Sequence, residues 1–397
     1  MGDDFIPLSV PNLRGKELEY TREAIQDEWV STGGKFIDEF EERLGTYVDA
    51  AGAVACQSGT AGIHLALELC GVEQGDEVLV PSLTFIATVN PVRYVKASPV
   101  FLDCDDTLNI DCEKLEHFLM TQCSLVNGDL INKKSKEKIK AIIVVHIFGN
   151  LVDMEKIMEL AKKYNLKVIE DATEALGSYY ITGKYAGRHA GTVGDIGIYS
   201  FNGNKIITTG GGGMIVSNNN KFIKRAKYLS TQAKDDDLFY IHNSIGYNYR
   251  MTNLQAALGL AQLEKLESFI KIKKENYDRY KKRIDKIAGM KLLDFVPNAR
   301  PNYWFYSLIL FDRRYHVKTF IEHLQNEKIQ SRPVWGLIHL QKPYKNYQTI
   351  EIEKALYYST RVLNIPCSTN LTKENVQRVV EAVESTAKYQ LLTQCQS

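Results

Sequence analysis

One lysine in the chain stands between a strand-like run and a cluster of glycines. In GDIGIYSFNGNKIITTGGGGMIV (194–216), an apolar run ends at Ser200, polar residues follow, and Lys205 precedes four consecutive glycines. Glycine permits positive φ and close approach of the backbone, so successive amides can form a concave anion site. A P-loop is excluded, because its glycines precede the lysine. Lys205 can therefore face a bound ligand, although a surface lysine beside a flexible hairpin has the same local pattern.

Three other segments carry groups that could act with this lysine. Asp171 ends the apolar run of VIEDATEAL, where a carboxylate can point into a pocket at a sheet end, although such residues are often helix caps. Ser58, Gly59 and Thr60 open an apolar helix, whose free amide groups could hold a phosphate, although Ser and Thr begin many helices. Phe85 follows another strand and could cover a planar ring or belong to the core.

Each of these signals is weak alone, and their combination is specific. A carboxylate, a lysine, a phosphate cradle and an aromatic side chain are what a protein needs to hold pyridoxal 5′-phosphate. We therefore expect this cofactor.

Short β-branched apolar runs recur along the first two thirds of the chain, each followed by a helical stretch. Such runs are typical of parallel strands buried on both faces in an α/β sheet. Ligands bind at the carboxyl ends of these strands, which is where the candidate residues lie. The expected strands are Val78–Val80, Pro99–Asp103, Ala141–His146, Lys167–Asp171, Ile196–Ser200 and Met214–Val216.

The pattern changes near Met251. A long polar helix is expected from there through RYKKRI, with Leu254, Leu258 and Leu263 at roughly helical spacing. Beyond it, YWFYSLILF predicts one strand, and the remainder mixes helices with proline-containing loops. We expect a large domain over residues 1–265, with a mixed, mostly parallel sheet, and a smaller C-terminal α+β domain over 266–397.

Composition excludes several classes of protein. The 397 residues are 44% hydrophobic, which is enough for a substantial core. Lys and Arg total 49 against 48 for Asp and Glu, and the net charge of +1 argues against a nucleic-acid-binding or regulatory role. The seven cysteines lack paired CxxC spacing, so we expect no metal or iron–sulfur site and a reducing compartment.

The first residues, MGDDFIPLSVPNLRG, lack the basic start and apolar run of a signal peptide. No segment approaches the roughly 20 apolar residues of a membrane helix. We expect a cytoplasmic protein without a membrane partner.

The chain resembles the DegT/DnrJ/StrS family of pyridoxal-phosphate-dependent nucleotide-sugar aminotransferases, which have the aspartate aminotransferase fold (fold type I). The resemblance runs from about residue 6 to residue 266 and continues more loosely into SRPVWGLIHLQKPY (331–344). It is carried by VSTGGKFIDEFEE (30–42), QSGTAGIHLAL (57–67), PSLTFIATVNPVRYV (81–95), IEDATEALGS (169–178), GDIGIYSFNGNK (194–205) and GYNYRMTNLQAALGLAQL (246–263).

The resemblance implies a role for each candidate. Lys205 matches the lysine that forms the internal aldimine and moves the proton, and Asp171 matches the carboxylate that keeps the pyridine nitrogen protonated. Phe85 matches the stacking aromatic. Glu174 stands near the cofactor's phenolic oxygen, where many relatives have Gln, and the chain reads GGGG at 210–213 where many read GEGG. Further cofactor contacts are expected from Ser58, Gly59, Thr60, Ser200 and Asn202.

The resemblance also implies a homodimer with shared active sites. Asn248 matches an asparagine that reaches the phosphate bound in the neighbouring subunit. The interface would be isologous, so each site would use the same residue from the opposite chain.

The implied reaction is a double displacement. Glutamate gives its amino group to the cofactor, which passes it to the ketone of a nucleotide-linked 4-keto-6-deoxy sugar.

Finer resemblance, in IPLSVPNLRG, residues 121–138 and residues 230–250, favours UDP-2-acetamido-4-keto-2,6-dideoxy-hexose and surface-polysaccharide biosynthesis. Amination at C3 and the family's sugar dehydratases remain alternatives, although dehydratases usually carry histidine where this chain has Lys205. Candidate sugar or diphosphate contacts, each of which could be structural, are Lys184, Tyr185, Arg188, Trp335 and His339.

Overall fold

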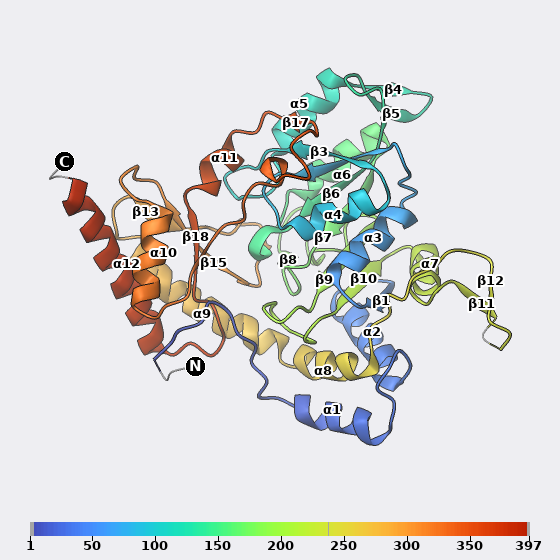
Figure 1. Cartoon of the computed structure of the whole chain (residues 1–397), viewed down its shortest axis with the longest axis horizontal. Coiled ribbons are helices and arrows are strands. Elements are labelled where there is room, and N and C mark those ends of the chain that lie inside the picture. Colours follow the sequence, from blue (N-terminus) through green and yellow to red (C-terminus); the bar gives the residue numbers. More distant parts are fainter. Residues whose placement is uncertain (1–3, 237, 395–397) are drawn as a thin grey trace.

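The computed structural model describes residues 4–236 and 238–394. Its main sheet has ten strands (Figure 1), eight of which form one continuous order. In that order they are β1 (Gly52–Cys56), β10 (Gly213–Ser217), β9 (Ile196–Ser200), β7 (Lys167–Asp171), β6 (Lys138–Val145), β2 (Glu77–Pro81), β3 (Ser98–Leu102) and β17 (Thr349–Ile350). The hairpin of β4 (Cys123–Val126) and β5 (Asp129–Asn132) joins it through β6.

Helices cover both faces of this sheet, as expected for strands that are apolar on both sides. Along β6, Ile142 and Val144 pack into one buried cluster, while Ala141 and Ile143 pack into the other. The helices of this region are α1 (Glu17–Gln26), α2 (Lys35–Tyr47), α3 (Gly59–Leu69), α4 (Ile86–Tyr94), α5 (Cys112–Gln122), α6 (Met154–Tyr164), α7 (Asn220–Ser230) and α8 (Asn253–Leu263). The predicted α/β class and fold type I are confirmed.

The expected mixed, mostly parallel sheet is confirmed, but two details are wrong at one edge: no helix follows the run Ile196–Ser200, and the run Met214–Val216 is antiparallel to its neighbours. β9 leads through a loop directly into β10, and β10 is antiparallel to both β9 and β1. A short, fully buried apolar run has the same sequence pattern in either direction, so its neighbours decide the direction. The loop that reverses the chain contains Lys205.

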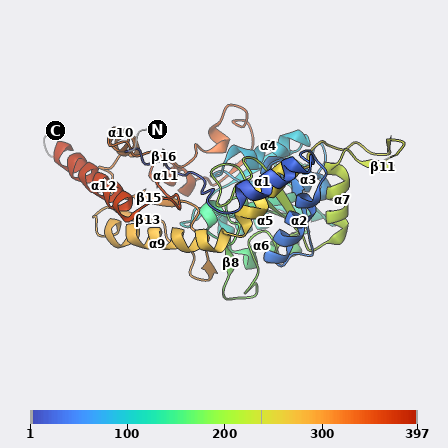
Figure 2. The same cartoon turned by 90° about the horizontal axis from the view of Figure 1, so that it is seen from below.

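A second, antiparallel sheet lies at the other end of the molecule, with the order β13 (Met290–Leu292), β15 (Tyr306–Leu310), β18 (Val362–Ile365) and β16 (Arg332–Pro333). The helices after α8 are α9 (Leu266–Ile284), α10 (Val317–Asn326), α11 (Lys354–Ser359) and α12 (Lys373–Gln394). Figure 2 shows α9 and α12 at this end. Short elements complete the fold: β8 (Tyr179–Tyr180) with β14 (Ala299–Arg300), β11 (Lys234–Asp236) with β12 (Ile241–His242), and the 3₁₀ turns Ile147–Gly149 and Ile338–Leu340.

The single long helix expected from Met251 is instead two helices. α8 begins with a capping box between Thr252 and Gln255, and the chain turns at Glu264 and Lys265 before α9 begins. The predicted domain boundary after residue 265 falls at this turn and stays a prediction. Each side of this boundary contributes residues to the other. The C-terminal strand β17 joins the main sheet, and Ile6 from the N-terminal segment pairs with Ile329.

Within the described ranges, no helix has both the length and the apolar character needed to cross a membrane.

Candidate active site

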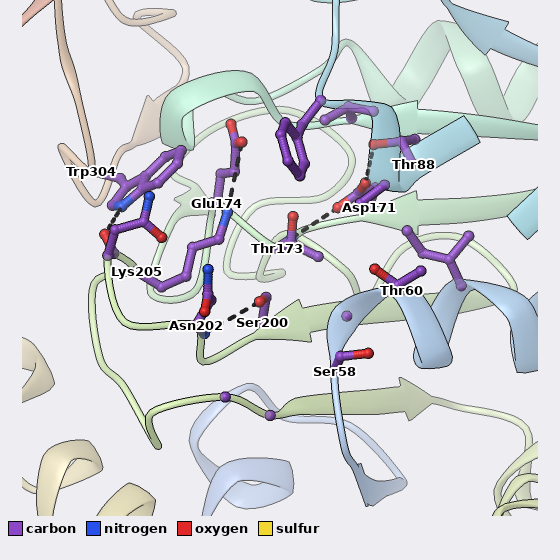
Figure 3. A pocket seen from close by; sticks show the side chains of 18 of the residues that line it. Ser58, Thr60, Thr88, Asp171, Thr173, Glu174, Ser200, Asn202, Lys205 and Trp304 are labelled. Atoms are coloured by element: carbon purple, nitrogen blue, oxygen red, sulfur yellow. Dashed lines mark hydrogen bonds and ion pairs between the residues drawn. The ribbon is translucent and has the colours of Figure 1, made fainter. Parts of the chain in front are cut away.

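A pocket opens where strand ends of the main sheet meet the N-terminus of α3 and a loop that precedes β15 (Figure 3). It brings together most of the residues that the sequence singled out. Its lining contains the predicted Ser58, Gly59, Thr60, Phe85, Asp171, Glu174, Ser200, Asn202, Lys205 and Trp335. Ten further residues complete it: Ile63, Ala87, Thr88, Val145, Thr173, Asn204, Gly211, Gly212, Trp304 and Phe305.

Lys205 points into this pocket from the loop between β9 and β10 (Figure 3). Its side chain is 13% exposed, and its Nζ lies 3.7 Å from Oε1 of Glu174 and 4.1 Å from the centre of the Trp304 ring. Burial lowers the pKa of the amine, while the carboxylates of Glu174 and Asp171 act in the opposite direction. A lysine with a lowered pKa supplies the neutral amine that a nucleophile or base needs.

Glu174 is buried beside the lysine, with an exposed fraction of 4%. The backbone amide of Phe148 donates to its Oε2 at 2.8 Å. Burial raises the pKa of Glu174 to about 7; the Asp171 charge adds to this, and Lys205 opposes it. Near neutral pH this carboxyl can therefore hold or release a proton next to the amine.

Asp171 is the last residue of β7 and is 2% exposed. Thr88 Oγ1 donates to its Oδ2 at 2.7 Å, and the amide of Thr173 donates to its Oδ1 at 3.1 Å (Figure 3). Both oxygens thus have a protein donor, which orients the carboxylate at the sheet end. A buried acceptor placed in this way can hold the proton of a heterocyclic nitrogen.

The opposite side of the pocket is built to receive an anion. Ser58 caps α3 by accepting from the amide of Ala61 at 3.1 Å, so the first turn of this helix faces the cavity. A Cβ on Gly59 would meet Ser200 Cβ at 3.2 Å, and one on Gly213 would meet the Ser58 carbonyl carbon at 2.6 Å. The absence of side chains at both glycines lets the helix end approach β9 and β10.

Aromatic side chains form the remaining wall. Phe85 is 52% exposed, and its ring centre lies 6.3 Å from that of Trp335. Trp335 in turn lies 4.9 Å from Phe148. Phe85 is thus an open aromatic face at the pocket rather than a core residue.

The other predicted residues do not line this pocket. Lys184, Tyr185 and Arg188 lie on the loop after β8, where Arg188 donates to the Thr192 carbonyl. His339 bonds the Ser82 hydroxyl at 2.5 Å.

Asn248 is also outside the cavity of its own chain. It is exposed and pairs with Thr231 at the base of the β11–β12 hairpin, which extends away from the rest of the chain in both views (Figure 1, Figure 2).

Sequence reasoning missed four residues that shape the site. Thr88 and Thr173 hold Asp171, Trp304 covers the Lys205 amine, and Asn204 precedes the lysine. Thr88 lies four residues after Thr84 in LTFIAT, a spacing that places both hydroxyls on one side of a helix start and was the available signal. No local pattern indicates Trp304, which arrives from a distant part of the chain.

The residues present fit pyridoxal phosphate. The pocket offers a buried amine with a lowered pKa, a carboxylate held by two donors, an anion site at a helix N-terminus and an exposed ring. The Asn204 Oδ1 atom is buried without a hydrogen-bond partner in the described structure, which leaves a polar group for a ligand. When bound, the cofactor supplies an electron-withdrawing ring next to the carbon that carries the amino group. Among the described residues there is no cluster of His, Cys, Asp or Glu that could hold a metal ion.

The fold and this site define a pyridoxal-phosphate-dependent aminotransferase of fold type I. The chain belongs to the DegT/DnrJ/EryC1/StrS aminotransferase family, whose family model matches residues 11–384. It is a nucleotide-sugar aminotransferase.

Relatives and a solved structure agree with this assignment. The chain is 38% identical to GDP-perosamine synthase of Escherichia coli O157:H7 over 382 residues, which cover 96% of this chain and 98% of the relative. It is 32% identical to UDP-4-amino-4,6-dideoxy-N-acetyl-beta-L-altrosamine transaminase of Campylobacter jejuni, covering 96% and 97%. A DegT DnrJ EryC1 StrS aminotransferase from Brucella abortus superposes with a TM-score of 0.84 at 25% identity, covering 93% and 95%.

Proposed function

We propose that the enzyme moves an amino group from glutamate to the C4 ketone of a UDP-linked 2-acetamido-4-keto-6-deoxy sugar. The observation that carries the catalytic part is the buried Lys205 amine, 3.7 Å from the carboxyl of Glu174, whose pKa burial raises to about 7. A reaction that takes a proton from one carbon and returns it to another needs a group that alternates between neutral and protonated forms. Lys205 is that group, and the Glu174 carboxylate stabilises its protonated form.

The other residues bind and orient. Asp171, held by Thr88 and Thr173, would keep a proton on the ring nitrogen of the cofactor. The first turn of α3, together with Ser200, would hold the phosphate. Asn202 and Ser58 also line the pocket, and the exposed ring of Phe85 would cover the cofactor ring.

The proposed substrate is supported by the names of two relatives and by resemblance in sequence. The Campylobacter relative is named for a UDP-linked 4-amino-4,6-dideoxy sugar, which matches C4 amination of a UDP sugar. The more similar E. coli relative is named for a GDP-linked product, so a GDP-linked keto sugar is the second candidate. Lys205 at the position where dehydratases usually have histidine argues against dehydration.

Of the proposed sugar contacts, Trp335 is the one that lines the pocket of its own chain, where its ring centre lies 6.3 Å from that of Phe85. We propose that Trp335 packs against the apolar face of the sugar. Lys184, Tyr185, Arg188 and His339 stay as candidates for contacts farther from the reacting carbon.

We also propose a homodimer in which Asn248 serves the partner's site. Its side chain is exposed and lies outside the cavity of its own chain, at the base of a projecting hairpin. A residue so placed can reach a phosphate in a second copy of the chain.

A panel of keto sugars tests the substrate. The purified enzyme with glutamate would be offered UDP-, GDP- and dTDP-linked 3-keto and 4-keto sugars, and the product structure read by NMR. We expect a UDP-linked 4-amino product. A GDP-linked product would favour the second candidate, and no amination of any keto sugar would contradict the proposed function.

A further inference from the structure

Trp304 contacts the loop of the catalytic lysine in two places. Its ring centre lies 4.1 Å from Nζ of Lys205, and its Nε1–H donates to the carbonyl of Asn204 at 2.8 Å (Figure 3). One indole thus bonds the residue before the lysine and also faces the lysine's amine. The negative face of an indole attracts a cation at this distance.

The indole is itself fixed by packing. Trp304 is 2% exposed and stacks on Phe305 with ring centres 4.0 Å apart and planes 13° from parallel. Its carbonyl accepts a hydrogen bond of 3.1 Å from Lys273, a buried lysine on α9. Among the described residues no carboxylate pairs with Lys273, whose Nζ donates to backbone carbonyls.

Asn302 connects the indole to Glu174. Its Oδ1 accepts from the Trp304 amide at 2.9 Å, and its Nδ2 donates to the Glu174 carbonyl at 2.8 Å and the Leu176 carbonyl at 3.0 Å. Asn302 is fully buried, and a Cβ on Gly149 would collide with its Oδ1. One amide side chain therefore holds the backbone of both residues that flank the lysine amine.

We propose that Trp304 is a positioning residue, anchored by Asn302, that holds the Lys205 amine beside the Glu174 carboxyl. This inference rests on the proposed role of Lys205 in catalysis. The charged groups around the amine are Asp171, which ends β7, and Glu174, which lies in the turn after it. Lys273 on α9 lines a small cavity that Lys205 also lines. The ring favours the ammonium form without adding a charge.

The first experiment measures the protonation of Lys205 in the full chain without added cofactor. The rate at which acetic anhydride modifies Lys205 would be followed against pH by peptide mass spectrometry. Trp304→Leu keeps an apolar neighbour and removes the π face, so the midpoint should fall by about one pH unit. Trp304→Phe keeps a ring and loses the Nε1 donor, so its midpoint should lie between the two. A midpoint in Trp304→Leu that is unchanged or raised would overturn the proposal.

A second measurement is made on protein that retains Trp304. The indole N–H resonances of ¹⁵N-tryptophan-labelled protein would be titrated with pH, with Trp304→Phe used only for assignment. The chemical shift of the Trp304 indole N–H should change with pH at the same midpoint as Lys205. In Lys205→Met it should not change with pH. Trp335 lines the same pocket without contacting Lys205 in the structure and serves as the internal reference. A Trp304 chemical shift whose pH dependence is the same in Lys205→Met would contradict the contact between the indole and the Lys205 amine.

The anchoring by Asn302 is tested by exchange. Asn302→Leu removes the acceptor of the Trp304 amide and both amide donors at similar size, and it should speed hydrogen exchange of the Trp304 indole by about tenfold or more. Asn364→Leu is the matched control, because that asparagine is also buried and its Oδ1 accepts from Ser307, away from Trp304. Equal exchange rates in the two variants would overturn the anchoring role.

These measurements separate the inference from the proposed function. Failure of the cofactor to attach to Lys205 would refute the catalytic role of the lysine. Attachment to Lys205 combined with an unchanged midpoint in Trp304→Leu would refute the positioning role alone.

Discussion

Thr88 donates a hydrogen bond of 2.7 Å from its Oγ1 to Oδ2 of Asp171, and both side chains are buried. The contact joins the first turn of α4 to the end of β7, 83 residues apart in sequence. It fixes the carboxylate on which protonation of the cofactor ring depends in the proposed mechanism. The strength of that contact can be measured.

Thr88→Val removes the hydroxyl at nearly constant shape. A hydrogen bond to a charged group is typically worth about 1.5–3 kcal/mol, so turnover with glutamate should fall about tenfold or more. Thr84→Val is the control, since Thr84 bonds Thr88 at 2.9 Å and has no contact with Asp171 in the structure. Stopped-flow rates of the glutamate half-reaction would show the difference, and equal rates in both variants would contradict the role of Thr88.

Asp171→Asn should keep the fold and lose the charge that holds a proton on the ring nitrogen. The half-reaction with glutamate should slow severely, while thermal unfolding shows that the variant is folded. If Asp171→Asn reacts at the wild-type rate, this residue is structural and another group must face the nitrogen.

Glu174 gives the protein a pH-dependent stability of defined sign. Its folded pKa of about 7 lies above the usual value of 4.5, so between these values the folded state holds more of the proton than the unfolded state. Stability should therefore fall as pH rises from 4.5 to 7, by an amount on the order of 3 kcal/mol at most. Glu174→Gln should lack this decline. Urea unfolding at pH 5 and pH 8 tests it, and an equal decline in the variant would assign the effect elsewhere.

The close approach of β10 to the end of α3 should not tolerate a methyl group. A Cβ at residue 213 would lie 2.6 Å from the Ser58 carbonyl carbon and 2.8 Å from the Gly59 nitrogen, so Gly213→Ala must move the phosphate cradle. We expect at least about a tenfold loss of affinity for pyridoxal phosphate, with destabilisation of about 1–3 kcal/mol. Gly203→Ala is the control, because nothing lies within 4 Å of its added Cβ. Fluorescence titration with pyridoxal phosphate measures the affinity of each variant, and urea unfolding measures its stability.

Much of this site was accessible from sequence because its residues sit at strand ends. Asp171 and Ser200 end β7 and β9 where the apolar runs end, and Ser58 caps α3 as its residue type suggests. Thr88 was missed although its four-residue spacing from Thr84 gave a signal, and Asn302 and Trp304 were missed because their roles depend on distant contacts that no periodicity encodes. The direction of β10 and the break between α8 and α9 were mispredicted, since apolar spacing reports burial and not strand direction or helix continuity.

Mixed subunits test the shared site. Lys205→Ala chains mixed with Asn248→Ala chains should form heterodimers with one intact site and one doubly damaged site, and activity should partly return. Native mass spectrometry would confirm that the subunits exchange. Heterodimers without activity above the sum of the two mutants would show that Asn248 acts within its own chain.

In the proposed mechanism Lys205 carries both the cofactor and the transferred proton. Borohydride reduction of the enzyme loaded with pyridoxal phosphate, followed by peptide mapping, tests it most directly, with Lys205→Ala as the control that should take up no label. We expect a single phosphopyridoxyl group on Lys205. A label on any other lysine, or no covalent label in an enzyme that still transaminates, would contradict it.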